Sequence, residues 1–105
     1  MSPNSQDQQD PGVVTRKRQE VRQPPLYKVL LHNDDYTTMD FVVMVLENVF
    51  NHDPATANRI MMSVHKDGVG VAGIYPRDVA ETKSTIVHSL ARKHEYPLKC
   101  SLERE

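Results

Sequence analysis

The sequence predicts an α+β domain in which three helices cover one face of a three-stranded antiparallel sheet. Two observations carry this prediction. Short apolar segments, two of them alternating with polar residues, lie at residues 26–32, 69–75 and 98–103, as strands require. Apolar residues recur at helical spacing in three longer segments, at residues 39–50, 54–66 and 76–94. The expected order is therefore strand, helix, helix, strand, helix, strand (β-α-α-β-α-β).

The 105-residue chain is expected to form one domain with an extension in front of it. Residues 1–25 contain no aromatic residue and are rich in Gln, Asp, Arg and Pro. Such a segment buries too little apolar surface to offset its conformational entropy, so a disordered N-terminal extension is predicted there. Residues 26–105 then form the core domain, which is long enough for one modest hydrophobic core.

Charge and cysteine content argue against several classes of function. The formal net charge of −1 gives no field for general nucleic-acid binding. The extension holds a basic cluster, for which a solvated segment is favoured over an RNA or membrane patch; it comprises Arg16, Lys17, Arg18 and Arg22. The single cysteine cannot form an internal disulfide, and no apolar run fits a membrane span or a secretory signal. We expect a cytoplasmic protein that binds neither nucleic acid nor membranes.

A polar turn at residues 33–38 separates the first strand, Leu26 to His32, from the first helix. Thr37 has the properties of an N-cap, and Asp40 three residues later completes a pattern like a capping box. The helix that follows, residues 39–50, has an unbroken apolar run at residues 41–46. A helix that packs a single stripe of side chains against a sheet needs fewer apolar residues than this run contains. The helix is therefore either covered on two sides or partly open to a ligand, and we favour the second.

The second helix has clear boundaries. Asp53 followed by Pro54 is a strong start signal, and Gly68 suits a left-handed end. His65 lies one turn beyond Met61 and shares its side of the helix. The apolar stripe of this helix comprises Ala57, Ile60, Met61 and Val64.

The third helix is expected to carry Pro76 in its first turn and to reach about His94. Lys83 lies on the apolar side of this helix, where its aliphatic stem can be buried although its ammonium group is charged. In the last strand, Cys100 is expected to be a small core residue, because it alternates with Leu98 and Leu102.

No catalytic residue, metal site or cofactor is predicted. The serines and the cysteine stand in no nucleophile motif, and the glycines match no phosphate loop. Asp34 and Asp35 are adjacent and would point apart in an extended segment. The five histidines have no ligand spacing, and a calcium loop lacks its glycine and closing glutamate.

Binding of a protonated amine fits the residues better. Asn33, Asp34 and Asp35 offer carboxylate and amide oxygens, and His65 offers a neutral ring nitrogen if the second helix lies beside the first. Beside them, a flexible apolar cup is expected from Met39, Val42, Met61 and Val64. The alternative is that the carboxylates only cap a turn, that Met61 and Val64 are plain core, and that His65 bonds a backbone group.

These residues resemble the ClpS family, adaptors that deliver N-end-rule substrates to Clp AAA+ unfoldases. The resemblance runs from Pro24 to Glu103 and rests on four segments: residues 25–42, with Asn-Asp-Asp-Tyr-Thr before a helix; residues 61–65, ending in Val-His; residues 79–83; and residues 96–98. In one departure, Thr38 stands where many members have Pro.

The resemblance implies a fold similar to the C-terminal domain of the bacterial ribosomal stalk protein. It implies binding of N-degron peptides whose free first residue is Leu, Phe, Tyr or Trp, with Asn33, Asp34 and His65 on the α-amino group. Asp35 and Thr37 would shape the loop. Met39 would act as a gatekeeper that excludes Ile and Val. The side-chain pocket would be lined by Met39, Val42, Met61, Val64 and Leu98.

The same resemblance implies a non-catalytic, monomeric adaptor. Asp78, Glu81 and Lys83 would dock on the N-terminal domain of a ClpA-like or ClpC-like unfoldase, and the extension would enter its pore. Two other readings stay open at this point. One is a structural or ribosome-associated interaction domain with the same fold and no amine pocket, and the other is a metal-dependent enzyme.

Overall fold

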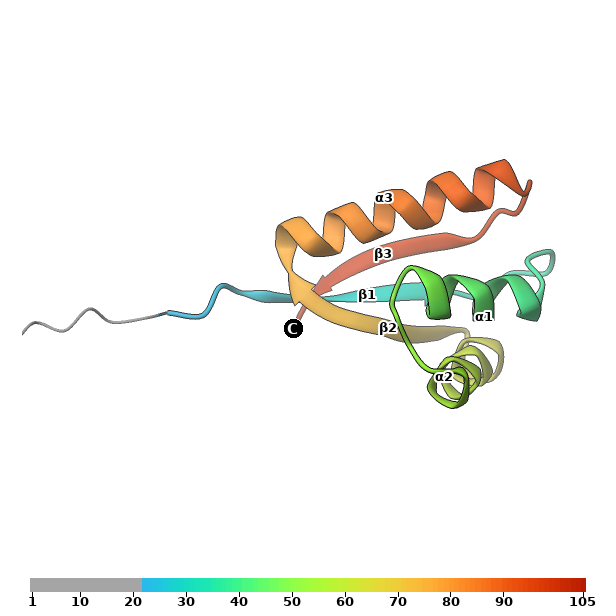
Figure 1. The fold of residues 1–105 in the computed structure, drawn as a ribbon, viewed down its shortest axis with the longest axis horizontal. Helices are drawn as coiled ribbons and strands as arrows, with labels where there is room; N and C mark the ends of the chain where they lie inside the picture. The colour runs from blue at the N-terminus through green and yellow to red at the C-terminus, as the bar shows by residue number, and fades with distance from the viewer. Residues whose placement is uncertain (1–21) are drawn as a thin grey trace, which may run out of the picture.

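The computed structural model describes residues 22–105 and has the predicted order of elements (Figure 1). Residues 22–25 have no regular secondary structure. The remainder of the predicted extension, residues 1–21, lies outside the described residues. The elements are β1 (Leu26–His32), α1 (Met39–Asn48), α2 (Pro54–Asp67), β2 (Val69–Pro76), α3 (Arg77–Lys93) and β3 (Lys99–Arg104).

The sheet has β1 at its centre, in the order β2-β1-β3, and both neighbours are antiparallel to it. The register between β1 and β2 shifts at Val29/Leu30, where Val29 pairs with Gly73 and Leu30 with Val71. Ala72 is therefore the extra residue of a bulge. The ring of His52, from the α1–α2 connection, hydrogen-bonds the carbonyl of Ala72 at 2.6 Å, so the bulge keeps its backbone oxygen satisfied.

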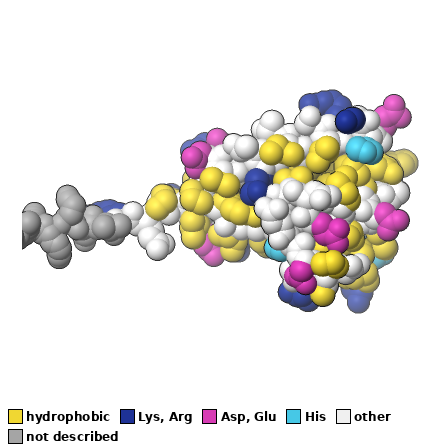
Figure 2. All heavy atoms as spheres, in the orientation of Figure 1, with side chains coloured by type: hydrophobic (Ala, Val, Ile, Leu, Met, Phe, Trp, Pro, Cys, Tyr) yellow, Lys and Arg dark blue, Asp and Glu magenta, His cyan; other side chains and the backbone are white. Residues whose placement is uncertain are grey.

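The core lies between the sheet and the three helices, which cover the same face (Figure 1). Val29 and Leu31 of β1 are fully buried, as are Val45 and Leu46 of α1 and Val87 of α3. The predicted α+β architecture, with three helices on one face of an antiparallel sheet, is confirmed. In the view of Figure 2, Lys and Arg side chains are scattered among carboxylates and apolar side chains.

The cap of α1 differs from the prediction. Thr38, not Thr37, is the N-cap, and its Oγ1 accepts a hydrogen bond from the N–H of Phe41 at 3.1 Å. Thr37 is drawn instead into the preceding turn, where its hydroxyl and its N–H both donate to Asp34. The capping-box-like pair with Asp40 is therefore wrong, because the cap begins one residue later.

Two other boundaries also differ. Pro76 ends β2 and forms the N-cap of α3, so it precedes the first turn of that helix. Helix α1 ends at Asn48, and Val49 and Phe50 are buried beyond its end. The start of α2 at Asp53-Pro54 and its left-handed end at Gly68 (φ 87°) are as predicted.

Candidate functional site

A pocket of about 270 Å³ lies where the turn at residues 33–38 and the start of α1 face the end of α2. Nine of the ten residues predicted to contact a ligand line it: Asn33, Asp34, Asp35, Thr37, Met39, Val42, Met61, Val64 and His65. The tenth, Leu98, is buried in the core and is not among the lining residues. Its position depends on the turn before β3, which local pattern does not specify.

Asp34 organises the turn. Its Oδ1 accepts the N–H groups of Tyr36 at 2.8 Å and Thr37 at 2.7 Å, and its Oδ2 accepts the Thr37 hydroxyl at 2.7 Å. Asp34 therefore holds the turn, which is the alternative role that the sequence analysis left open for this carboxylate. A carboxylate has about four lone-pair sites, so three bonds leave Oδ2 able to accept one more.

The charge on Asp34 is stabilised by the same bonds. Partial burial raises the pKa of this carboxyl group, but the hydrogen bonds from Thr37 and Tyr36 outweigh burial and hold the pKa below its ordinary value. Asp34 is consequently an anion at neutral pH, fixed in place at the edge of the pocket.

The backbone joins the turn to α2. The N–H of Asn33 donates to the carbonyl of Gly68 at 2.9 Å, and the N–H of Gly68 donates to the carbonyl of Val64 at 3.0 Å. Because Gly68 adopts a left-handed conformation (φ 87°), the chain leaves α2 directly beside the end of β1. This link brings His65 and Asn33 to the same pocket.

The polar groups on the rim are open to a ligand. Asn33, Asp35 and His65 are exposed. Within residues 22–105, their side chains form no hydrogen bond or ion pair with one another or with other described residues. The alternative that His65 satisfies a backbone group is therefore not seen in this part of the chain.

The floor of the pocket is apolar and belongs to the core. Val42 is 6% exposed, Met61 8% and Val64 2%, whereas Met39 at the start of α1 is 42% exposed. The reading of Met61 and Val64 as core is correct, and both also face the cavity. A Cβ on Gly70 would lie 2.7 Å from the Cγ2 of Val64, so this glycine allows α2 to sit close against β2.

A group of aromatic ring contacts at the start of α1 was not predicted from the sequence. The ring of Phe41 lies 4.8 Å from the ring of Tyr96 and 5.2 Å from that of His94. These contacts hold the first turn of α1, and thus Met39, against the end of α3. No local pattern links Phe41 to residues more than fifty positions away, and only the predicted apolar run at residues 41–46 indicated that Phe41 is buried.

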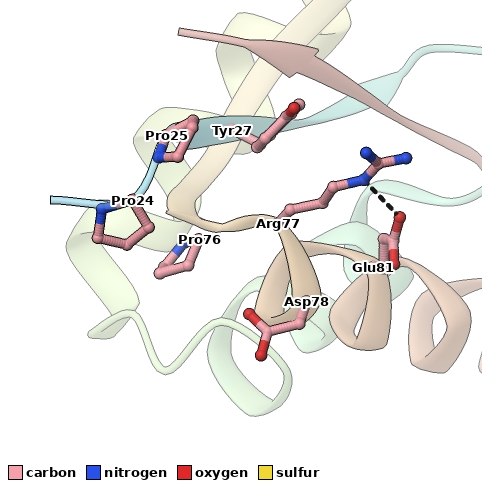
Figure 3. Close-up of a pocket in the computed structure, with 7 residues that line it drawn as sticks. All are labelled: Pro24, Pro25, Tyr27, Pro76, Arg77, Asp78 and Glu81. Atoms are coloured by element: carbon pink, nitrogen blue, oxygen red, sulfur yellow. Dashed lines mark hydrogen bonds and ion pairs between the residues drawn. The ribbon is translucent and has the colours of Figure 1, made fainter. Parts of the chain in front are cut away.

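The three residues predicted to dock a partner lie on the first two turns of α3, away from the pocket. Their environments differ. Asp78 is exposed and accepts a hydrogen bond from the N–H of Val79, and Glu81 pairs with Arg77 at 2.9 Å (Figure 3). Lys83 is half-buried, and its Nζ donates to the carbonyl of Val49 at 2.7 Å.

Two features of the described residues bear on other functions. Residues 22–105 contain no group of three or more His, Cys, Asp or Glu side chains placed to hold a metal ion. No helix among them is both long and apolar enough to cross a membrane.

Comparison with known proteins places this geometry in context. The family model for the ATP-dependent Clp protease adaptor protein ClpS matches residues 22–101. The chain is 52% identical over 101 residues to the ClpS adapter of Desulfotalea psychrophila, covering 96% of this chain and 99% of that protein. It is 57% identical over 93 residues to the ClpS adapter of Desulfatibacillum aliphaticivorans, covering 89% of each.

A solved structure is similar as well. Agrobacterium tumefaciens ClpS2, in complex with L-phenylalaninamide, superposes with a TM-score of 0.76 at 42% sequence identity. The match covers 79% of this chain and all of that one.

Proposed function

The chain belongs to the ClpS family of ATP-dependent Clp protease adaptor proteins, and on that premise we propose that it captures N-degron substrates by their first residue. The proposed ligand is a peptide with a free α-amino group on Leu, Phe, Tyr or Trp. The observation that supports this most is a single pocket with an anionic and amide rim over an apolar floor. Such a pocket suits a ligand in which a cationic group lies next to a large apolar side chain.

In this proposal the ammonium group is bound by three acceptors. Its three N–H donors match the remaining acceptor site of Asp34, the amide oxygen of Asn33 and a ring nitrogen of His65. Asp35 adds negative charge to the rim, and Thr37 keeps the turn closed through Asp34. Charge-assisted bonds of this kind contribute about 1.5–3 kcal/mol each.

The side chain of the first residue enters the apolar part. Burying one large apolar side chain there contributes about 1.5–3 kcal/mol. After the costs of association, a total near about −8 kcal/mol, or micromolar affinity, is within reach. Met39 is the proposed gatekeeper, because it stands partly exposed at the rim while Val42, Met61 and Val64 form the floor. Leu98 belongs to the same buried cluster as the floor residues Val42, Met61 and Val64.

Delivery of the bound substrate is inferred from membership of the adaptor family. We propose that the start of α3, with Asp78, Glu81 and Lys83, docks on the N-terminal domain of a ClpA-like or ClpC-like unfoldase in the cytoplasm. The N-terminal extension then engages the pore of the unfoldase. No covalent step is assigned to the adaptor, which acts as a monomer without a cofactor.

The test compares two peptides that differ at one group. Fluorescence anisotropy is measured for a labelled peptide that begins with Phe and for the same peptide N-acetylated. We expect the free amine to bind with micromolar or better affinity and acetylation to abolish binding, because it removes the charge and two donors. Equal binding of both peptides would refute amine recognition.

A further inference from the structure

A closed turn at the end of α3 fixes the position of Tyr96. The N–H of Tyr96 donates to the carbonyl of Ala91 at 2.8 Å. The N–H of Glu95 donates to the carbonyl of Arg92 at 3.1 Å, and Glu95 itself is in the left-handed conformation (φ 63°). These two bonds and this backbone conformation form a Schellman motif, which ends a helix and holds the following residue against it. Tyr96 therefore has a defined place, although β3 begins only at Lys99.

The ring of Tyr96 lies against the start of α1. The end of α3 and the start of α1 are at the same end of the domain, away from residues 22–25 (Figure 1). There the centre of the Tyr96 ring is 4.8 Å from that of Phe41, with 50° between the ring planes, and the ring of His94 is 5.2 Å from Phe41. Tilted aromatic pairs with centres about 4.5–7 Å apart attract one another. Phe41 is almost fully buried, and two of the rings against it come from the end of α3.

Phe41 faces away from the amine pocket. Met39 and Val42 line the pocket, and residues three apart lie on the same side of a helix. Phe41 follows Met39 by two residues and so points to roughly the opposite side of α1. Neither Phe41 nor Tyr96 is among the residues that line the pocket. The first turn of α1 is thus held between the pocket and the end of α3, and the position of Met39 depends on how far the Phe41 ring can move towards Tyr96.

The ring of Tyr96, and not its hydroxyl group, makes the stronger contact with α1. The hydroxyl of Thr38 donates to the Tyr96 hydroxyl at 3.5 Å, which is longer than the roughly 2.5–3.0 Å of a strong O–H···O bond. The same Thr38 oxygen accepts the N–H of Phe41 at 3.1 Å, and Thr38 is exposed, so water can replace the long bond. Removing the hydroxyl therefore changes little, whereas removing the ring leaves a space beside Phe41 into which the first turn of α1 can move.

We propose that Tyr96 is a positioning residue for selectivity at the first residue of the peptide. Through Phe41 it holds the first turn of α1, so that Met39 stays where it narrows the entrance of the amine pocket. Tyr96 itself touches no ligand. This inference rests on the proposed function and extends control of the first-residue preference to the end of α3. Without the ring, the first turn of α1 has more freedom, and the entrance admits side chains that are branched at Cβ.

The experiment changes the ring and leaves the lining of the pocket intact. Tyr96→Leu removes the aromatic ring, and Tyr96→Phe is the conservative variant that keeps it. Val87→Ala is the control for lost stability, because Val87 is fully buried in the middle of α3. Competition anisotropy gives the affinities of peptides that begin with Phe, Ile and Val, and chemical denaturation gives the free energy of unfolding of each variant.

We expect Tyr96→Leu to lower the preference for Phe over Ile and Val by about fivefold, while affinity for the Phe peptide stays within about threefold of the unmodified protein. We expect Tyr96→Phe and Val87→Ala to keep the preference of the unmodified protein. His94→Ala removes the other ring from Phe41 at an exposed position, so it serves as the second variant if Tyr96→Leu does not fold. For His94→Ala we expect a shift of about twofold in the same direction.

An unchanged preference in Tyr96→Leu would overturn the proposal, and so would an equal shift in Val87→Ala, because general loosening of the domain would then explain it. If Tyr96→Leu does not fold, an unchanged preference in His94→Ala overturns the proposal instead. If the unmodified protein binds free and N-acetylated Phe peptides equally, the proposed function fails and this inference fails with it. If it binds only the free amine and Tyr96→Leu discriminates as the unmodified protein does, this inference alone fails.

Discussion

The two ends of β1 differ in how the polar side chains around them are satisfied. At the His32 end, Asn33, Asp35 and His65 are exposed, with no partner among the described side chains, around an apolar floor. At the Leu26 end, Arg77 and Lys83 are satisfied within the protein, and apolar groups are exposed. In the proposed function, the first end binds the ammonium group of a peptide and the second end docks on the unfoldase, so variants at one end leave binding at the other unchanged.

The largest effect is expected for Asp34→Ala. It removes an acceptor of the ammonium group and all three hydrogen bonds that close the turn. We expect peptide affinity to fall roughly 100-fold, with unfoldase-domain binding unchanged. Anisotropy with a Phe peptide and calorimetry with the domain measure the two effects.

Asp35→Ala is the matched control, since it removes one carboxylate from the rim without opening the turn. A loss for Asp35→Ala as large as that for Asp34→Ala would show that charge alone matters. Retention of peptide binding within about threefold in Asp34→Ala would contradict the role of the turn.

The next effect concerns specificity. Met39→Ala enlarges the entrance between the turn and the floor. We expect peptides that begin with Ile or Val to gain about tenfold relative to the Phe peptide, because a methionine side chain no longer limits room near the branch point. Competition anisotropy with the three peptides measures this ratio. Unchanged discrimination would remove Met39 as gatekeeper.

A smaller effect is expected for Gly70→Ala. The new Cβ would meet the Cγ2 of Val64 at 2.7 Å and two backbone atoms of α2 at 3.3 Å, so α2 must shift. Overpacking of this kind costs about 1–3 kcal/mol of the free energy of unfolding. Chemical denaturation measures the loss, with Val71→Ala on the exposed side of β2 as the control. A native-like free energy of unfolding for Gly70→Ala would show that α2 is not held by this contact.

The smallest effect concerns the third acceptor of the ammonium group. If a ring nitrogen of His65 accepts a bond from the ammonium group, His65→Ala removes that acceptor, and we expect peptide affinity to fall several-fold at constant pH.

His65→Gln is the matched control, because its side-chain amide oxygen is still an acceptor. We expect it to keep more peptide affinity than His65→Ala, as measured by anisotropy with the Phe peptide. Unchanged affinity in His65→Ala would exclude His65 as the acceptor.

The sequence predicts most of the fold because its signals are local. Asp53-Pro54 starts α2 and Gly68 ends it through residue preferences that act within one turn. The cap of α1 was placed wrongly because Thr37 and Thr38 both suit an N-cap. The choice is made by Asp34, which takes up the hydroxyl and N–H of Thr37.

The site was predicted in outline for a different reason. Carboxylate, amide and imidazole groups before α1 and at the end of α2 indicated an amine ligand, and the family resemblance supplied their roles. Tertiary packing decided the rest. The inward direction of Lys83 depends on Val49, and the burial of Leu98 depends on the turn before β3. No spacing along the chain specifies either one.

One titration tests the central contrast between the two ends. L-phenylalaninamide is added to isotope-labelled protein, and backbone amide shifts are followed by NMR. We predict shift changes in residues 33–39 and 61–65 together, with none in residues 77–81 at the start of α3 beyond the noise. Changes confined to one of the two pocket segments, or centred on the start of α3, would contradict the account.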